Sequence, residues 1–195
     1  MADKNRSSDS NFDWSGNNTG VLVGAAVAGA AVGLAANVGR KLFVQFSSGV
    51  TGDWVETLKT EHEMTLTLFD KLEATDDSQT VMRSHLLAKI KYALSKHAIQ
   101  EEMVVYPALR QHGEEGDADE LNADHGYVKT YLYELENMDK NDPQWIARVR
   151  DFRAMLEEHM REEENDVFPR FRTTLSDDEN AKLTTAMNKE GFNFA

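Results

Sequence analysis

Apolar residues from Asp53 onward recur every three or four positions, which is the spacing of one face of an α-helix. Short polar segments separate four such stripes. The stripes cover residues 54–72, 86–108, 121–135 and 145–167. No run alternates apolar and polar residues for long enough to predict a strand. The pattern therefore predicts an all-α fold, and short connections favour an antiparallel up-down four-helix bundle.

Helix-start signals agree with these stripes. Capping boxes, in which an acceptor side chain precedes a glutamate by three positions, are present at Asp53 and Glu56, Asp117 and Glu120, and Ser176 and Glu179. Asp142 followed by Pro143 is a further helix start. The last box predicts a short fifth helix that ends before Gly191. Pro107 and Pro169 are expected to end the second and fourth helices.

The second and fourth stripes contain the same motif. H-x-x-x-E-E-x-x-x-x-P runs from His97 to Pro107 and again from His159 to Pro169, 62 residues later. The preceding stripe in each half carries one histidine, His62 in the first half and His125 in the second. The domain thus reads as two copies of a helical hairpin, and each hairpin supplies two histidines and a carboxylate.

The repeated histidines and glutamates fall on the apolar stripes, so they are predicted to face the interior. One buried histidine is more often a hydrogen-bonded core residue, but four at mirrored positions with two mirrored carboxylates would be costly to bury without a ligand. Imidazole and carboxylate ligands suit iron, manganese or zinc, and two carboxylates suit a pair of ions. The predicted metal ligands are His62, His97, Glu101, His125, His159 and Glu163.

Other polar residues near these positions fit simpler interpretations. Acidic runs are usually solvated helix faces. The glutamates of the two runs here are therefore expected either to face solvent or to contact a metal ligand without binding the metal themselves; they are Glu102, Glu162 and Glu164. His85 and His112 have neither a mirrored partner nor a carboxylate four residues on, so neither is expected to bind metal.

The mirrored motif, with His62 and His125 in the preceding helices, resembles the hemerythrin-like proteins with HHE cation-binding domains. The resemblance covers roughly residues 53–172. It implies a non-heme centre of two iron ions, bridged by Glu101 and Glu163 and by an oxo or hydroxo group, that binds O₂ or a related small molecule.

Two positions depart from the oxygen-carrying hemerythrins. Those proteins have a second histidine one turn after the first on the third helix, where this chain has Lys129. One iron would therefore have an open position, and Tyr106 or Tyr127 could approach it. A lysine facing two cations is expected to extend out of the bundle or to be neutral. Those carriers also place the fourth-helix carboxylate five positions after its histidine, which would select Glu164, but Glu163 repeats Glu101.

Two competing metal sites are not supported. A ferritin-like site needs Glu-x-x-His, and no histidine here has a glutamate three positions before it. A zinc protease helix needs H-E-x-x-H, but the position four after His62 is Leu66.

Composition limits the partners and the compartment. The chain of 195 residues has a net charge of −13, which disfavours nucleic acid as a partner. It has no cysteine, which excludes a thiolate metal site and fits a reducing cytoplasm.

The sequence before the bundle has a different composition. Residues 1–19 are polar and expected to be flexible. Residues 20–46 form a predicted Gly/Ala-rich helix whose uncharged part, 20–39, carries small residues at four-residue spacing; residues 47–52 form a linker. Self-association into a homo-oligomer is the favoured role for 20–39, and membrane association through 21–38 is the alternative. The bundle is expected at 53–175, with a C-terminal helix and tail at 176–195.

These features lead to a hypothesis and an alternative. The chain is predicted to be a di-iron protein that binds or senses O₂, peroxide or nitric oxide, with peroxide consumption left open. The alternative is an iron-responsive oligomeric assembly, or an iron-binding module without catalysis.

Overall fold

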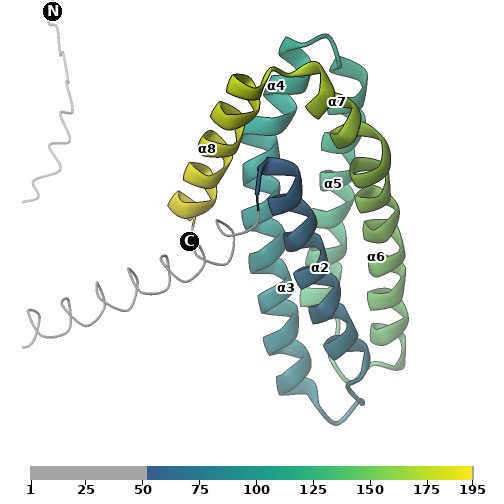
Figure 1. Ribbon diagram of the computed structural model, residues 1–195. Coiled ribbons are helices and arrows are strands. Elements are labelled where there is room, and N and C mark those ends of the chain that lie inside the picture. The colour runs from purple at the N-terminus through teal and green to yellow at the C-terminus, as the bar shows by residue number, and fades with distance from the viewer. Residues whose placement is uncertain (1–51, 195) are drawn as a thin grey trace, which may run out of the picture. The chain divides into compact units, whose positions relative to one another are not determined.

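The structure, a computed structural model, describes residues 52–194 and is all-helical over that range (Figure 1). Four long helical rods alternate in direction, which confirms the predicted all-α bundle. Two of the rods consist of three consecutive segments each. The elements are α2 (Trp54–Glu73), α3 (Thr80–Gln100) with η1 (Glu101–Val105) and α4 (Tyr106–Gln111), α5 (Glu115–Asn137), α6 (Pro143–Glu162) with η2 (Glu163–Val167) and α7 (Phe168–Thr174), and α8 (Asp177–Phe194).

The core consists of two hydrophobic clusters along the bundle axis. One includes Phe69, Leu94 and Phe152, and the other includes Trp54, Val105 and Phe168. On every rod the predicted metal-binding positions fall between residues of the first cluster and residues of the second. Apolar packing above and below therefore fixes the four helices around a polar layer.

Most of the predicted helix starts are confirmed. The Asp53 carboxylate accepts hydrogen bonds from the backbone of Val55 and Glu56, and Asp142 accepts one from Gln144. Ser176 and Glu179 form a reciprocal capping box. The prediction at Asp117 is wrong, because α5 begins at Glu115 and the Asp117 carboxylate instead pairs with Arg170.

The predicted helix ends at Pro107 and Pro169 are also wrong. Both rods continue past the proline, into α4 and α7. Each proline is the second residue after a five-residue π-helical segment, and the first residue after that segment bonds five positions back, from Tyr106 to Glu101 and from Phe168 to Glu163. Because the hydrogen-bond register changes there, a residue without an N–H fits with little loss.

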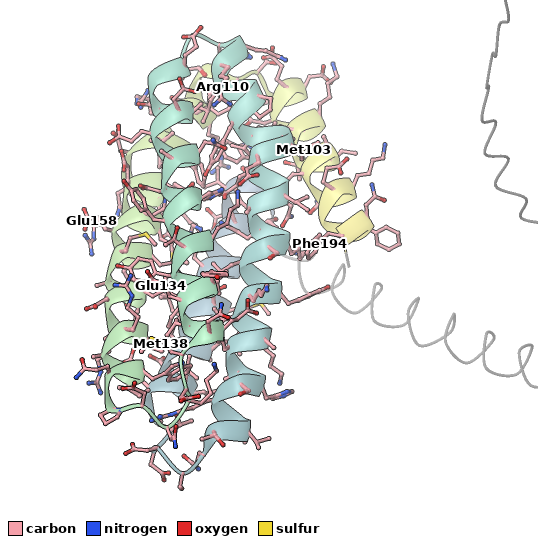
Figure 2. All side chains as sticks on the ribbon, turned by 180° about the vertical axis from the view of Figure 1, so that it is seen from behind. Met103, Arg110, Glu134, Met138, Glu158 and Phe194 are labelled. Carbon is pink, nitrogen blue, oxygen red and sulfur yellow. The ribbon has the colours of Figure 1, made fainter. Side chains whose placement is uncertain are left out.

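The fifth helix is longer than predicted. It begins at the Ser176 capping box but runs past Gly191 to Phe194, which lies at its carboxyl end (Figure 2). Gly191 does not stop the helix; it lies where α8 packs on α3. The helix therefore forms an added layer on one side of the bundle (Figure 1).

The predicted flexible segment 1–19, the Gly/Ala-rich helix at 20–46 and nearly all of the linker at 47–52 lie outside the described residues. Within residues 52–194, no helix combines the length and the apolar character needed to cross a membrane.

Candidate metal centre

The six predicted ligands lie together between the two hydrophobic clusters. Each of them is at most 5% exposed. Their ligand atoms form two overlapping groups whose members lie within 4.8 Å of one another. The first group is His62, His97, Glu101 and Glu163, and the second is Glu101, His125 and His159. The four helices thus bring together all the residues that the repeat selected, and the two groups share Glu101.

Each buried carboxylate reaches histidines from both hairpins. The Glu101 oxygens lie 3.2 Å from His97 Nε2 and 3.3 Å from His125 Nε2. The Glu163 oxygens lie 3.4 Å from His62 Nε2 and 3.5 Å from His159 Nε2. Both carboxylates are therefore placed to span two positions for a cation.

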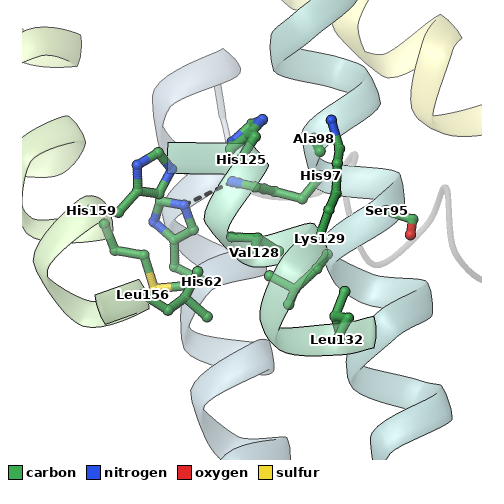
Figure 3. A pocket seen from close by; sticks show the side chains of 12 residues that line it. His62, Ser95, His97, Ala98, His125, Val128, Lys129, Leu132, Leu156 and His159 are labelled. Carbon is green, nitrogen blue, oxygen red and sulfur yellow. Dashed lines mark hydrogen bonds between the residues drawn. The ribbon is translucent and has the colours of Figure 1, made fainter. Parts of the chain in front are cut away.

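Several atoms of this cluster fit a metal better than they fit one another. Glu101 Oε1, Glu163 Oε2 and His159 Nε2 are buried and have no hydrogen-bond partner. His62 Nε2 and His97 Nε2 face each other at 2.8 Å (Figure 3), an arrangement in which two lone pairs repel unless a proton lies between them. Because unsatisfied buried polar atoms are costly, the donor set suits bound cations.

The π-helical segments begin at the two buried glutamates. η1 starts at Glu101 and η2 starts at Glu163, so both copies of the repeat widen the helix at the same point. Glu101 and Glu163 point into the cluster, while the next residues, Glu102 and Glu164, contact the outer side of a histidine. The widened turn thus lets two consecutive glutamates serve the same site.

A carboxylate binds the outward nitrogen of each of the four histidines. Glu102 lies 2.9 Å from His125 Nδ1 and Glu164 lies 2.7 Å from His62 Nδ1. The other two carboxylates precede the first histidine of each hairpin. They are Glu61, 3.2 Å from His97 Nδ1, and Asp124, 3.3 Å from His159 Nδ1. Such bonds fix the tautomer that leaves Nε2 free for a metal.

The sequence interpretation missed Glu61 and Asp124 and treated Glu102 and Glu164 only as solvated or supporting residues. A signal was present, because each of the four is adjacent in sequence to a predicted ligand. Glu164 lies outside the cluster and Glu163 within it, as the repeat indicated. His85 and His112 are exposed, away from the cluster.

Of the two tyrosines considered for the expected open position, Tyr106 lies beside His125. Its hydroxyl donates to Glu163 Oε1 at 2.9 Å and lies 3.2 Å from His125 Nε2. Tyr127 is 61% exposed. The Lys129 side chain is 66% exposed and its Nζ lies 3.0 Å from Glu102, so the expectation that it extends out of the bundle is confirmed.

We expect Tyr106→Phe to lower the free energy of unfolding of the metal-free protein by about 1–3 kcal/mol, because the buried Glu163 carboxylate loses its hydroxyl donor. Urea unfolding measures the change. Tyr127→Phe is the matched control and should leave the midpoint unchanged. Equal midpoints for Tyr106→Phe and the parent would contradict the bond to Glu163.

The pKa values of the two buried glutamates move in opposite directions. Burial and the nearby charge of Glu101 raise the pKa of Glu163 well above its usual value. Burial alone would raise the pKa of Glu101 too, but the charge of His97 and the close approach of His125 hold this pKa well below its usual value. Burial lowers the pKa of His159 to about 4.

A cavity of about 50 Å³ adjoins the histidines on one side (Figure 3). Its histidine wall is His62, His97, His125 and His159. Apolar side chains form most of the rest, and Lys129 is part of its lining. The apolar residues include Leu94, Val128, Leu132, Leu156 and Met160. Because one water needs about 10–15 Å³, the cavity admits molecules of a few atoms only.

Comparison with known proteins agrees with this geometry. The sequence-family model for the hemerythrin HHE cation binding domain matches residues 53–171, so the chain belongs to this family. The chain is 28% identical over 130 residues to a DNA nickase of Nostoc sp. (strain PCC 7120), covering 67% of this chain and 36% of the nickase. It is 26% identical over 132 residues to an uncharacterized hemerythrin-like protein of Schizosaccharomyces pombe, covering 66% of this chain and 64% of that protein.

The chain thus spans about a third of the nickase and less than two thirds of the yeast protein. No solved structure matches it significantly. The buried histidine and glutamate cluster lies within the matched range and fits the cation-binding role of the family.

Proposed function

We propose that the protein is a non-heme di-iron protein that binds O₂, peroxide or nitric oxide in the cavity beside its metal centre. His62, His97, His125 and His159 would hold two iron ions, with Glu101 and Glu163 as bridges. The observation that carries the proposal is the small, largely apolar cavity against the four histidines. Bound iron would supply an electrophilic, redox-active centre to a molecule that enters the cavity.

The chain's own residues select the ligand. Leu132, Leu156 and Met160 contribute to an apolar wall that favours small neutral molecules over ions. The cavity volume excludes organic substrates of ordinary size. Tyr106 holds its proton, because burial and the charges of Glu101 and Glu163 raise its pKa well above the usual value. Its hydroxyl is thus a hydrogen-bond donor beside His125 rather than an anion.

Metal analysis tests the proposal. The full-length protein, loaded with ferrous iron without oxygen and then freed of excess, should contain two iron ions per chain. It should then react with O₂, peroxide or nitric oxide with a change in its absorption spectrum. Zinc in place of iron, or much less than two ions per chain, would refute the di-iron proposal.

We expect Val128→Phe to slow that reaction roughly ten- to hundredfold, because the added ring enters the cavity and a steric cost of about 1–3 kcal/mol opposes entry of the ligand. Iron content should stay at two ions per chain, since Val128 contacts the cavity and is not a ligand. Stopped-flow absorption measures the rate. Val81→Phe, at a position 83% exposed, is the matched control. An unchanged rate in Val128→Phe would exclude the cavity as the ligand site.

The relative that cleaves DNA does not change this proposal. The match covers 36% of that nickase, and this chain has a net charge of −13, which disfavours a phosphate-backbone partner. Small molecules remain the proposed ligands, and self-association through residues 20–39 remains a proposal for a segment outside the described residues.

A further inference from the structure

The two hairpins are alike at the metal centre but differ one layer farther out. Glu61 supports His97 as Asp124 supports His159, yet the Glu61 side chain is 12% exposed and the Asp124 side chain 29%. The cause lies in the next residues of the repeat. Lys96 and Gln100 of the first hairpin are buried, whereas the equivalent residue Glu158, 62 positions after Lys96, has a side chain 73% exposed.

Buried polar groups fix the Glu61 carboxylate. The Lys96 ammonium pairs with Glu61 Oε1, and Glu61 Oε2 lies 3.2 Å from His97 Nδ1. The Gln100 amide, in the orientation that satisfies its hydrogen bonds, donates to Glu61 Oε2 at 2.8 Å. His97 is therefore held through a network of Lys96, Gln100 and Glu61 from which water is largely excluded, and such networks are stronger than exposed ones.

Helix α8 covers this network. A Cβ atom on Gly191 would lie 2.9 Å from the end of the Gln100 amide and 3.2 Å from Lys96 Cε, so only glycine lets α8 approach so closely. Near the start of α8, the Trp54 ring nitrogen donates a hydrogen bond to the Asn180 side chain at 2.9 Å, which holds this end of the helix against α2. The Tyr92 and Phe194 rings meet at 5.6 Å at the other end. Helix α8 packs mainly on α3, η1 and α2, which are elements of the first hairpin.

The two metal positions also differ in their ligands. The group around His62 and His97 has four ligand atoms from the protein, and the group around His125 and His159 has three. The Tyr106 hydroxyl occupies Glu163 Oε1 and lies beside His125 Nε2. The second position therefore has fewer ligand atoms close to one another, and the two carboxylates that support its histidines, Glu102 and Asp124, are both more exposed to water than Glu61.

We propose that α8 is a clamp that retains the metal ion at His62 and His97, while the ion at His125 and His159 exchanges readily. This rests on the proposed two-metal centre but adds a role for a helix that lies outside the matched range of residues 53–171. The clamp acts by excluding water from Lys96, Gln100 and Glu61, which hold His97 in place. Lys96 and Glu61 are thus positioning residues.

The rate of iron release tests the clamp. The full-length protein, loaded with ferrous iron without oxygen, is mixed with excess chromogenic chelator. We expect two phases of equal amplitude. Gly191→Leu should lift α8 and accelerate the slow phase roughly ten- to hundredfold, the usual effect of disturbing groups that support a metal ligand, and leave the fast phase unchanged. Gly116→Leu is the matched control, because a side chain there meets nothing within 4 Å.

A second variant keeps the test decisive if Gly191→Leu does not fold. Lys96→Gln removes the ammonium from Glu61 with α8 intact and should also accelerate only the slow phase. A single release phase in the parent, or a slow phase unchanged in both variants, would overturn the clamp and leave the two-metal centre standing. A parent that takes up no iron would instead refute the proposed function itself.

Discussion

Replacement of Glu101 by alanine is expected to abolish binding of both iron ions. Glu101 is shared by the two groups of ligand atoms, and its oxygens lie 3.2 Å and 3.3 Å from histidines of different hairpins. Loss of this one side chain therefore removes a ligand from both positions. Iron per chain after anaerobic loading and removal of excess should fall from about two to near zero, since a metal site depends on its full ligand set.

Glu102→Ala is the matched control, one residue farther along the same segment. Glu102 contacts His125 Nδ1 and Lys129 rather than the interior of the cluster. The variant should retain both ions with an affinity lower by roughly ten- to hundredfold, the usual effect of removing a group that orients a ligand. Equal loss of iron from the two variants, with both folded by circular dichroism, would mean that Glu101 does not bridge.

Periodicity was sufficient to predict the four helices and the inward direction of the six residues. Apolar stripes at helical spacing fix which face of each helix is buried, and His62, His97, His125 and His159 fall on those faces. The repeat then places the four histidines at one height in an antiparallel bundle. Local capping rules were reliable at Asp53 and Asp142 and failed at Asp117, whose carboxylate pairs with Arg170 inside a helix that begins at Glu115.

The parts that could not be predicted depend on contacts between distant segments. A π-helical turn adds one residue to a helix without a sequence signature of its own, so the continuation past Pro169 was not foreseen. Tyr106 reaches Glu163 across 57 positions of the chain. The role of Gly191 depends on the approach of α8 to Gln100. A glycine near the end of an apolar stripe normally predicts a helix end, and only the packing partner reveals the close approach.

Loading with iron is expected to stabilise the bundle strongly. Glu101 and Glu163 are fully buried, and three atoms of the cluster are buried without a hydrogen-bond partner. An ion that binds these atoms only in the folded protein raises the free energy of unfolding by mass action, by about 4 kcal/mol when free iron is about 1,000 times the Kd. For a chain of this size, that gain corresponds to a rise in Tm of roughly 10 °C.

Thermal unfolding of the metal-free and iron-loaded protein, with Glu101→Ala in parallel, measures the gain. The variant should show no rise, because it lacks the shared ligand. Oligomer size measured on the same samples separates the two hypotheses from the sequence. A size that changes with iron favours the iron-responsive assembly, whereas a constant size with a large rise in Tm and a rapid reaction with O₂ or peroxide favours the small-molecule site. An unchanged Tm on loading would show that the buried histidine and glutamate cluster does not bind iron in the folded protein.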